Sequence, residues 1–503
     1  MTDDSGSGSG RSDTGESIIE RLGSSRRTFL KGTSAIAGGA ALGSTAAGEE
    51  SESNGESKSD GGTNDDENSG PTNVVMYVGD GQGVTHLSLG RYLKAYQEDP
   101  EAFPLNVSEV GYNFDRFEAE GLTTTHPDDP NEFVTDSAAA GTAFSSGVKT
   151  YNGAIGGYAE NGEFVETTTV LEAAREMGYA TGLVTTARMT HATPACFAAH
   201  VPDRNEEAAI AAQYLENANV DVLFGGGRQY FLPEGREDGE NLVQAFEEEG
   251  YAYAETASGL DAIDSAPALG LFAEESHMNY VLDRMDGESD QPGLPEMAEK
   301  ALQLLEAESD GEGIFLMVEA ARIDHASHAN DFAVAYEQTE ADDTVGTVLD
   351  YADGLDNETL ALGTADHECG ALSLGYGGPY NMNFDVLAGV AASGEAMETA
   401  VSGVEPDTLG GDGRDRIEEL LRQYGDIEPT DSELDEAMYG YAVPPKEIIN
   451  ERIRLGWNSV GHTGAEIVSF AQGPNSEAVD SSHDNTDLAD VVFRTLGTEN
   501  QNT

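Results

Sequence analysis

Three short segments of the chain place carboxylates and imidazoles at spacings that suit a bound cation. Asp324 and His328 are four residues apart, so on one helical turn they would share a face and could hold the same ion. Asp366 and His367 directly follow an apolar run, and His462 lies in a glycine-bounded Gly-His-Thr-Gly loop. A single histidine is more often an ordinary surface or core residue, so the inference rests on the ensemble. Such donors suit zinc, and two cations about 4 Å apart could activate a nucleophile and stabilise a leaving oxygen.

Ser137 is the candidate nucleophile. It follows Asp136 and precedes a run of three alanines, which favours a helix start. A plain N-cap explains a serine or an aspartate here equally well. As a nucleophile, Ser137 would lie at the positive end of the helix, where phosphate also binds. A nearby cation would hold its hydroxyl as the alkoxide, without a histidine base.

The elements that must position these residues are strands alternating with helices. Helical patterns cover 168–177 and 331–351, and they alternate with five apolar runs that we expect to be buried strands, at 73–78, 180–185, 314–318, 360–364 and 466–470. This alternation predicts an α/β fold with a mostly parallel central sheet flanked by helices. Asp80, Glu319 and Asp366 lie at predicted strand ends. Such sheets build their sites at the carboxyl ends of strands.

Two long segments are expected to be insertions in this framework. One runs from about 221 to 295 and the other from about 370 to 461. The second contains none of the ten histidines, so we expect it to decorate the site rather than to build it.

The charge of the chain is extreme, with 94 acidic against 25 basic residues and a formal net charge of −69. Such a chain repels nucleic acid and anionic membranes, so no nucleic-acid binding is expected. A disordered acidic protein is one interpretation. Apolar periodic segments and scattered acids favour instead a folded protein adapted to very high salt, where cations screen the repulsion.

The two cysteines, Cys196 and Cys369, provide no disulfide framework. One bridge between them is possible, and two buried free thiols are the simpler interpretation. Cys369 lies close in sequence to the proposed metal ligands, but we do not expect it to be one of them.

The N-terminal region has the pattern of an export signal. The segment Ser-Arg-Arg-Thr-Phe-Leu-Lys at 25–31 precedes a short stretch of small apolar residues, which together indicate a twin-arginine signal peptide over 1–47. The stretch is too short and too rich in Ala and Gly to span a bilayer, so no membrane insertion is expected. Residues 48–70 predict a disordered acidic linker. The protein is therefore expected outside the cell or at its surface.

In their order along the chain, these motifs resemble those of the alkaline phosphatases. The resemblance covers nearly everything from 73 to 495, on the motifs Val-Gly-Asp80-Gly, Thr-Asp136-Ser137-Ala, His191-Ala-Thr193-Pro, His200-Val-Pro-Asp-Arg204, Glu319 through His328, Thr-Ala-Asp366-His367 and His462-Thr-Gly. It implies an alkaline-phosphatase-like catalytic domain over 71–498, with the segment from 370 to 461 as the family's variable crown insertion.

The resemblance also implies a role for each matched residue. Ser137 would attack phosphate monoesters and pass through a phosphoserine, and Arg204 would hold two phosphate oxygens, beside Asp136. Two Zn²⁺ ions would be bound, one by Asp324, His328 and His462, the other by Asp80, Asp366 and His367. A third ion, Mg²⁺, would use Asp80, Thr193 and Glu319.

His191 and His325 depart from the enterobacterial branch of the family, which has Asp and Lys there. His191 at the third site could recruit Mn²⁺ or Zn²⁺ in place of Mg²⁺. His325 would contact phosphate through water, as a titratable replacement for an ammonium.

Two competing functions remain open at this point. A phosphodiesterase of the same superfamily would share the metal core, although such enzymes usually present Thr as nucleophile. Sulfatases need a Cys/Ser-x-Pro context that Ser137 lacks. A non-catalytic acidic surface protein that binds cations fits the charge but leaves the ordered Ser, Arg, His and Asp motifs unexplained. The expected function is extracellular phosphate scavenging on small monoesters, by a homodimer as is common in the family.

Overall fold

A computed structural model describes residues 72–218, 220–285, 289–354, 358–401, 412–439 and 445–502. The predicted signal peptide (1–47) and linker (48–70) lie outside these residues. The chain divides into two units, Met1–Asp65 and Asp66–Thr503, and the described residues all belong to the second. Among them, no helix is both long and apolar enough to cross a membrane.

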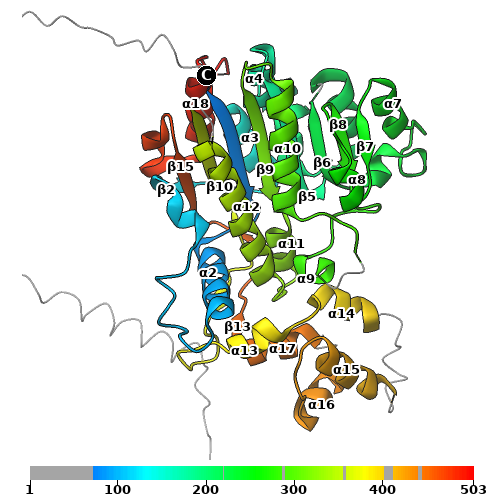
Figure 1. The fold of residues 1–503 in the computed structure, drawn as a ribbon, viewed down its shortest axis with the longest axis vertical. Helices are drawn as coiled ribbons and strands as arrows, with labels where there is room; N and C mark the ends of the chain where they lie inside the picture. The colour runs from blue at the N-terminus through cyan, green and yellow to red at the C-terminus, as the bar shows by residue number, and fades with distance from the viewer. Residues whose placement is uncertain are drawn as a thin grey trace, which may run out of the picture. The chain divides into compact units, whose positions relative to one another are not determined.

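A ten-stranded sheet forms the centre of this unit, in the order β16-β2-β15-β10-β1-β9-β5-β6-β8-β7 (Figure 1). β15 runs antiparallel to its neighbours β10 and β2, while the other pairs of this sheet are parallel, so the predicted mostly parallel sheet is confirmed. The strands are β1 (Asn73–Gly79), β2 (Ala119–Thr124), β5 (Ala180–Arg188), β6 (Val222–Gly226), β7 (Ala252–Ala254), β8 (Ala268–Leu271), β9 (Ile314–Ala320), β10 (Thr359–Ala365), β15 (Ile467–Gln472) and β16 (Ser481–Asp484).

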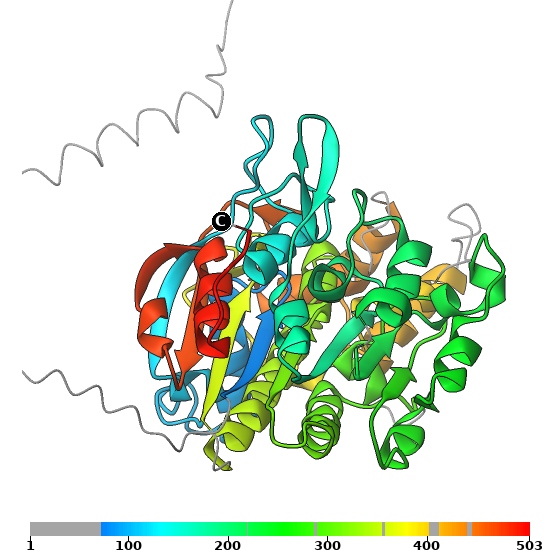
Figure 2. The ribbon, with the colours of Figure 1, turned by 90° about the horizontal axis from the view of Figure 1, so that it is seen from above.

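Helices cover both faces of the sheet (Figure 2). Val75 and Tyr77 of β1 pack on one face, in a core shared with α10 (Leu294–Glu308) and α12 (Val334–Gly354). Val74, Met76 and Val78 pack on the other, with α3 (Ser137–Ser146) and α18 (Asn485–Leu496). Because alternate residues of a strand point to opposite faces, a strand buried on both sides is continuously apolar.

The remaining helices are mostly short. Predicted helix 168–177 corresponds to α4, and 331–351 corresponds to α12. The others are α2 (Val84–Glu98), α4 (Val170–Glu176), α5 (Ala192–Ala198), α6 (Glu207–Gln213), α7 (Leu242–Glu248), α8 (Ala257–Asp261), α9 (Val281–Arg284), α11 (Arg322–His328), α13 (Phe384–Gly389), α14 (Gly394–Val401), α15 (Asp412–Gln423), α16 (Asp431–Tyr439) and α17 (Pro445–Ile453).

The two segments expected to be insertions differ in structure. The segment from 221 to 295 supplies β6, β7 and β8, which extend one edge of the main sheet. Its status as an insertion stays a prediction.

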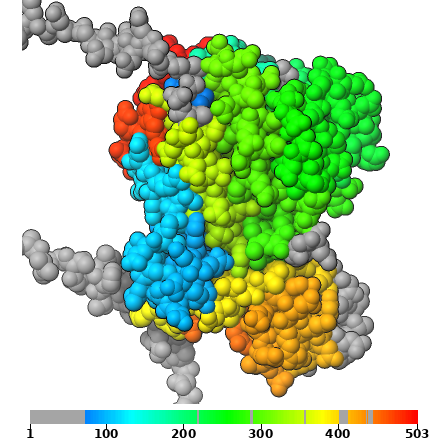
Figure 3. Space-filling model, in the orientation of Figure 1, coloured from blue at the N-terminus to red at the C-terminus, as the bar shows by residue number. Residues whose placement is uncertain are grey.

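The segment from 370 to 461 contributes α13 to α17, which lie at the lower end of the views in Figures 1 and 3. It leaves and rejoins the domain through two short antiparallel pairs. These are β11 (Glu368–Cys369) with β14 (His462–Thr463), and β12 (Ser373–Leu374) with β13 (Leu455–Gly456).

Candidate active site

The register of three central strands brings the predicted acidic residues together. Gly79 of β1 pairs with Ala320 of β9 and with Ala365 of β10. Asp80 and Asp366 each follow one residue later, so both leave the sheet at the same edge. Glu319 pairs with Thr185 of β5, whose hydroxyl donates a 2.5 Å hydrogen bond to its carboxylate. The carboxyl ends of parallel strands thus form the floor of the site.

Gly81 makes this convergence possible. Its φ of +73° lies in the left-handed region, and its N–H donates to Asp366 Oδ1 at 3.0 Å. A Cβ atom at this position would lie 2.8 Å from Asp324 Cα. Only glycine allows the backbone to adopt this turn against α11.

A first group of donors joins Asp324 and His328 of α11 to His462 of β14, the set that the family resemblance implied. His328 Nε2 lies 3.0 Å from His462 Nε2 and 3.3 Å from Asp324 Oδ2. His462 Nε2 lies 3.6 Å from Asp324 Oδ1. Cys369 belongs to the same group, although the sequence argument set it aside as a ligand.

A second group lies deeper and joins Asp80, Asp324 and His367. His367 Nε2 is 3.7 Å from Asp80 Oδ1 and 3.1 Å from Asp366 Oδ2, so Asp366 adjoins the group as well. The Ser137 hydroxyl approaches this same nitrogen of His367 at 3.3 Å.

A third group joins Asp80, His191 and Glu319. His191 precedes α5 as its N-cap residue, and its Nδ1 lies 3.9 Å from Asp80 Oδ2. Thr193, in the first turn of α5, is fully buried. Burial raises the pKa of Glu319 to about 7.

Several oxygen and nitrogen atoms of these groups are buried without a hydrogen-bond partner, which is expected where a cation binds. Both carboxylate oxygens of Asp80 lack a hydrogen bond, as do His191 Nδ1, Thr193 Oγ1, Glu319 Oε1, Asp324 Oδ1 and Asp366 Oδ2. Burial, and then the neighbouring Asp366, raise the pKa of Asp80. Buried carboxylates at this density are costly unless cations compensate them. The residues present therefore fit bound metal ions.

The sequence left Ser137 as either the N-cap of α3 or a nucleophile, and the structure gives the capping role to Asp136. The Asp136 carboxylate caps α3, accepting a hydrogen bond from Ala139 N at 2.9 Å. Ser137 is the first helical residue, and its hydroxyl faces His367 instead of the helix backbone. The cap is therefore supplied by the neighbour, which leaves the Ser137 oxygen available for chemistry.

Arg204 lies beside the start of α3. Its Nη1 donates to Asp136 Oδ2 at 2.9 Å, and its Nη2 lies 3.0 Å from His191 Nε2. Burial, followed by the charge of Arg204, lowers the pKa of His191 well below its ordinary value. The guanidinium thus connects the N-terminus of α3 with the third donor group.

His277 is a residue of the site that sequence reasoning missed. Its ring centroid lies 3.8 Å from that of His325 and 5.7 Å from that of His191. Arg188 Nη1 lies 3.2 Å from His277 Nε2. Burial is the first cause that lowers the pKa of both His277 and His325. No motif marks His277, because it lies in the segment set aside as an insertion.

Comparison with known proteins agrees with this geometry. The alkaline phosphatase family profile matches residues 71–498. Alkaline phosphatase 3 of Bacillus subtilis (strain 168) is 36% identical over 441 residues, which cover 84% of this chain and 88% of that protein. The chain belongs to the alkaline phosphatase family. The enzyme is accordingly a metal-binding phosphoric monoester hydrolase.

Two solved alkaline phosphatases share the fold of this family member. The Thermus thermophilus enzyme has a TM-score of 0.74 and 30% identity, covering 85% of this chain and 92% of its own. A histidine-to-aspartate variant of the enzyme from the Antarctic bacterium TAB5, solved with magnesium bound in its M3 site, has a TM-score of 0.60 and 25% identity. It covers 86% of this chain and 99% of its own.

Proposed function

We propose that Ser137 is the nucleophile of this phosphatase and that hydrolysis proceeds through a covalent phosphoserine. The observation that carries the proposal is the position of the Ser137 hydroxyl, which lies 3.3 Å from His367 Nε2 while Asp136 caps the helix. The positive end of α3 would stabilise the phosphate that Ser137 attacks.

The reaction requires two displacements at phosphorus. Ser137 Oγ loses its proton and attacks phosphorus, the bond between phosphorus and the ester oxygen breaks, and the leaving oxygen takes up a proton to depart as the alcohol. Water then loses a proton and attacks the phosphoserine, the bond to Ser137 Oγ breaks, and Ser137 regains its proton as inorganic phosphate leaves.

Arg204 holds the phosphate during both displacements. Its fork geometry suits two oxygens of a terminal phosphate, and contacts of its two terminal nitrogens with Asp136 and His191 orient the guanidinium. A dianionic monoester therefore fits better than a diester. His325 lies near His191, with a 5.5 Å distance between ring centroids, and contacts the phosphate through water.

Two Zn²⁺ ions and a third ion complete the site. Asp324, His328 and His462 would hold one zinc, and Asp80, Asp366 and His367 would hold the other, next to Ser137. Bound cations supply the charge that stabilises the serine alkoxide, the leaving oxygen and the attacking water.

The third ion would be held by Asp80, Thr193, Glu319 and His191. Mg²⁺ prefers all-oxygen ligands, so the imidazole of His191 favours Mn²⁺ or Zn²⁺ as alternatives. The magnesium in the M3 site of the TAB5 variant, where a histidine was replaced by aspartate, supports this dependence on the donor.

The setting of the enzyme is extracellular phosphate scavenging at high salt. The twin-arginine pattern near 25–31 supports export, and the net charge of −69 supports adaptation to salt and argues against nucleic-acid partners. A homodimer is the proposed assembly, by family membership.

Turnover of matched monoester and diester substrates tests the proposed function. At molar salt, p-nitrophenyl phosphate should be hydrolysed at least 100-fold faster than bis-p-nitrophenyl phosphate, and chelation should abolish turnover until zinc and magnesium are restored. Faster cleavage of the diester would support the phosphodiesterase alternative. Undiminished turnover after complete metal removal would contradict the metal-dependent mechanism.

A further inference from the structure

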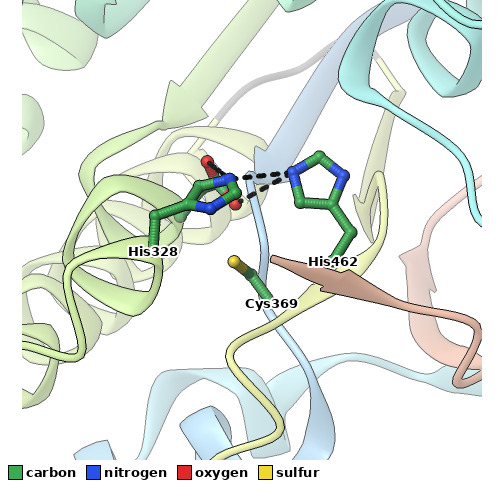
Figure 4. Close-up of side chains that lie close together, drawn as sticks. His328, Cys369 and His462 are labelled. Carbon is green, nitrogen blue, oxygen red and sulfur yellow. Dashed lines mark hydrogen bonds and ion pairs between the residues drawn. The ribbon is translucent and has the colours of Figure 1, made fainter. Parts of the chain in front are cut away.

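Cys369 lies at the first donor group, in a position fixed by the backbone. It pairs with His462 in the β11–β14 ladder, and directly opposed residues of an antiparallel pair project to the same face. Cys369 N–H donates to Gly81 O and Gly370 N–H donates to Gly461 O, both at 3.1 Å, which hold the pair on both sides. Figure 4 shows the thiol directed toward the space between His328 and His462.

The donor distances of this group lie near those expected around one zinc ion. Zinc bonds of about 2.0–2.3 Å imply donor separations of roughly 3.3–3.8 Å. The imidazole of His328 lies 3.0 Å from that of His462 and 3.3 Å from Asp324 Oδ2, and His462 lies 3.6 Å from Asp324 Oδ1. The Cys369 sulfur belongs to the same group, whose four ligand atoms lie within 4.8 Å of one another.

A second observation points to a ligand at the same place. Asp324 Oδ1 is buried without a hydrogen-bond partner, and Asp324 is only 4% exposed. Cys369 is fully buried next to this carboxylate. A buried carboxylate oxygen that accepts no hydrogen bond, beside two imidazoles and a sulfur, indicates a missing cation rather than a hydrogen-bond network.

We propose that Cys369 Sγ is the fourth protein ligand of the cation held by Asp324, His328 and His462. The proposal rests on the assignment of that cation given above. Binding would release the thiol proton to solvent, because the thiolate is the ligand form. A soft sulfur donor would favour Zn²⁺ over Mg²⁺ at this site. The side chain of His328 is 41% exposed, so this donor group is open to solvent on one side.

The competing explanation is that the thiol only hydrogen-bonds Asp324 and positions it. Loss of a sulfur–metal bond and loss of a hydrogen bond to Asp324 would both weaken metal binding, so a measured affinity does not distinguish the two roles of Cys369. A direct sulfur–metal bond has a spectroscopic signature that a positioning role lacks.

Cobalt substitution of the full chain supplies that signature. The apoenzyme is loaded with Co²⁺ at molar salt, and the near-ultraviolet spectrum is examined for a thiolate-to-cobalt charge-transfer band. We expect the band in the wild type and its loss in Cys369→Ser, with visible cobalt bands retained in both. A wild-type spectrum with bound cobalt but no charge-transfer band would overturn the proposal.

Cys196→Ser is the matched control. Cys196 is equally buried, but its Sγ donates to Ala138 O and it belongs to none of the donor groups found in the described residues. This variant should keep the band, and loss of the band here would refute the assignment to Cys369. The wild-type spectrum remains decisive even if Cys369→Ser fails to fold.

Activity distinguishes failure of this proposal from failure of the proposed function. Zinc-loaded wild type that hydrolyses p-nitrophenyl phosphate but shows no cobalt–thiolate band would overturn the Cys369 ligand alone. A band without any phosphatase activity would support the ligand and contradict the function.

Discussion

Arg204 illustrates how the site depends on geometry within single residues. Its two terminal nitrogens contact Asp136 and His191, so the guanidinium is already oriented toward the start of α3. Arg204→Lys keeps the charge but loses the planar fork. We expect KM for p-nitrophenyl phosphate to rise roughly 10–100-fold, the equivalent of about 1.5–3 kcal/mol for a charged hydrogen bond.

Arg175→Lys is the control for this prediction. Arg175 pairs with Asp221 at 2.6 Å and belongs to α4, outside the donor groups. The KM of the Arg175→Lys variant for p-nitrophenyl phosphate should stay within about twofold of the wild-type value. The same KM in both variants would show that Arg204 does not hold substrate.

The sequence predicted the central residues of the site but not all of its neighbours. Asp80, Asp366 and His367 directly follow apolar strands, so their convergence can be read from local pattern. His277 follows β8 and reaches the site through ring contacts, while Cys369, two residues beyond His367, is directed to the first donor group by the two-residue β11–β14 ladder. The choice of Asp136 over Ser137 as the cap was also not predictable, because both residue types cap helices.

At the scale of elements, the turn after β1 leaves no room for a side chain at Gly81. Gly81→Ala would place a methyl group 2.8 Å from Asp324 Cα in a left-handed backbone conformation. We expect at least a tenfold loss of zinc affinity, measured by chelator competition, with a parallel loss of turnover.

Gly162→Ala is the control that separates the cost of a left-handed backbone conformation from the cost of the contact with Asp324. Gly162 has a φ of +85° in the β3 (Gly157–Glu160) to β4 (Glu163–Glu166) turn, and nothing lies within 4 Å of an added Cβ. Its cost should be about 1–2 kcal/mol of stability with normal zinc affinity. Equal zinc affinity in both variants would contradict the role of the β1 turn.

Glu337 makes α12 sensitive to pH. It is buried, and burial and then Glu340 raise its pKa to about 8, against the opposing charges of Arg284 and Arg322. The pKa of Glu337 in the folded state exceeds the unfolded value of 4.5. The stability that this buried proton contributes is therefore fully present below pH 4.5 and is lost as the pH rises through about 8. Glu337→Gln should therefore lose less thermal stability than the wild type between about pH 5 and pH 8.

The measurement is thermal unfolding of the metal-loaded enzyme at molar salt. Glu308→Gln, on the exposed end of α10, is the control and should follow the wild-type pH profile. If the Glu337→Gln profile also runs parallel to the wild type, the buried proton is not part of the folded state.

Some strands could be predicted from the sequence, and others could not. All five apolar runs are strands, because strands buried on both faces carry a continuous apolar signal. β7 has three residues and β8 has four, too few to show a period. β2 alternates buried and exposed residues at one side of the sheet, a weaker pattern that was not recognised.

At the scale of the whole molecule, the net charge of −69 should make stability depend on salt. Screening lengths are about 3 Å at 1 M salt but about 10 Å at 0.1 M, so repulsion between surface carboxylates grows on dilution. We expect loss of circular dichroism and activity after dialysis into dilute buffer with zinc and magnesium kept constant. Full activity after prolonged dialysis would contradict adaptation to high salt.

The central claim is that Ser137 carries the phosphoryl group. The direct measurement is acid quenching of the enzyme during turnover, followed by peptide mapping for phosphoserine at molar salt. The wild type and Ser145→Ala, altered in the same helix at a hydroxyl that donates to Cys196 O, should show phosphate on Ser137. Ser137→Ala should show no phosphopeptide and lose turnover by at least 1,000-fold, roughly the effect of removing a nucleophile. A phosphorylated residue elsewhere, or Ser137→Ala turning over as fast as the wild type, would contradict the account.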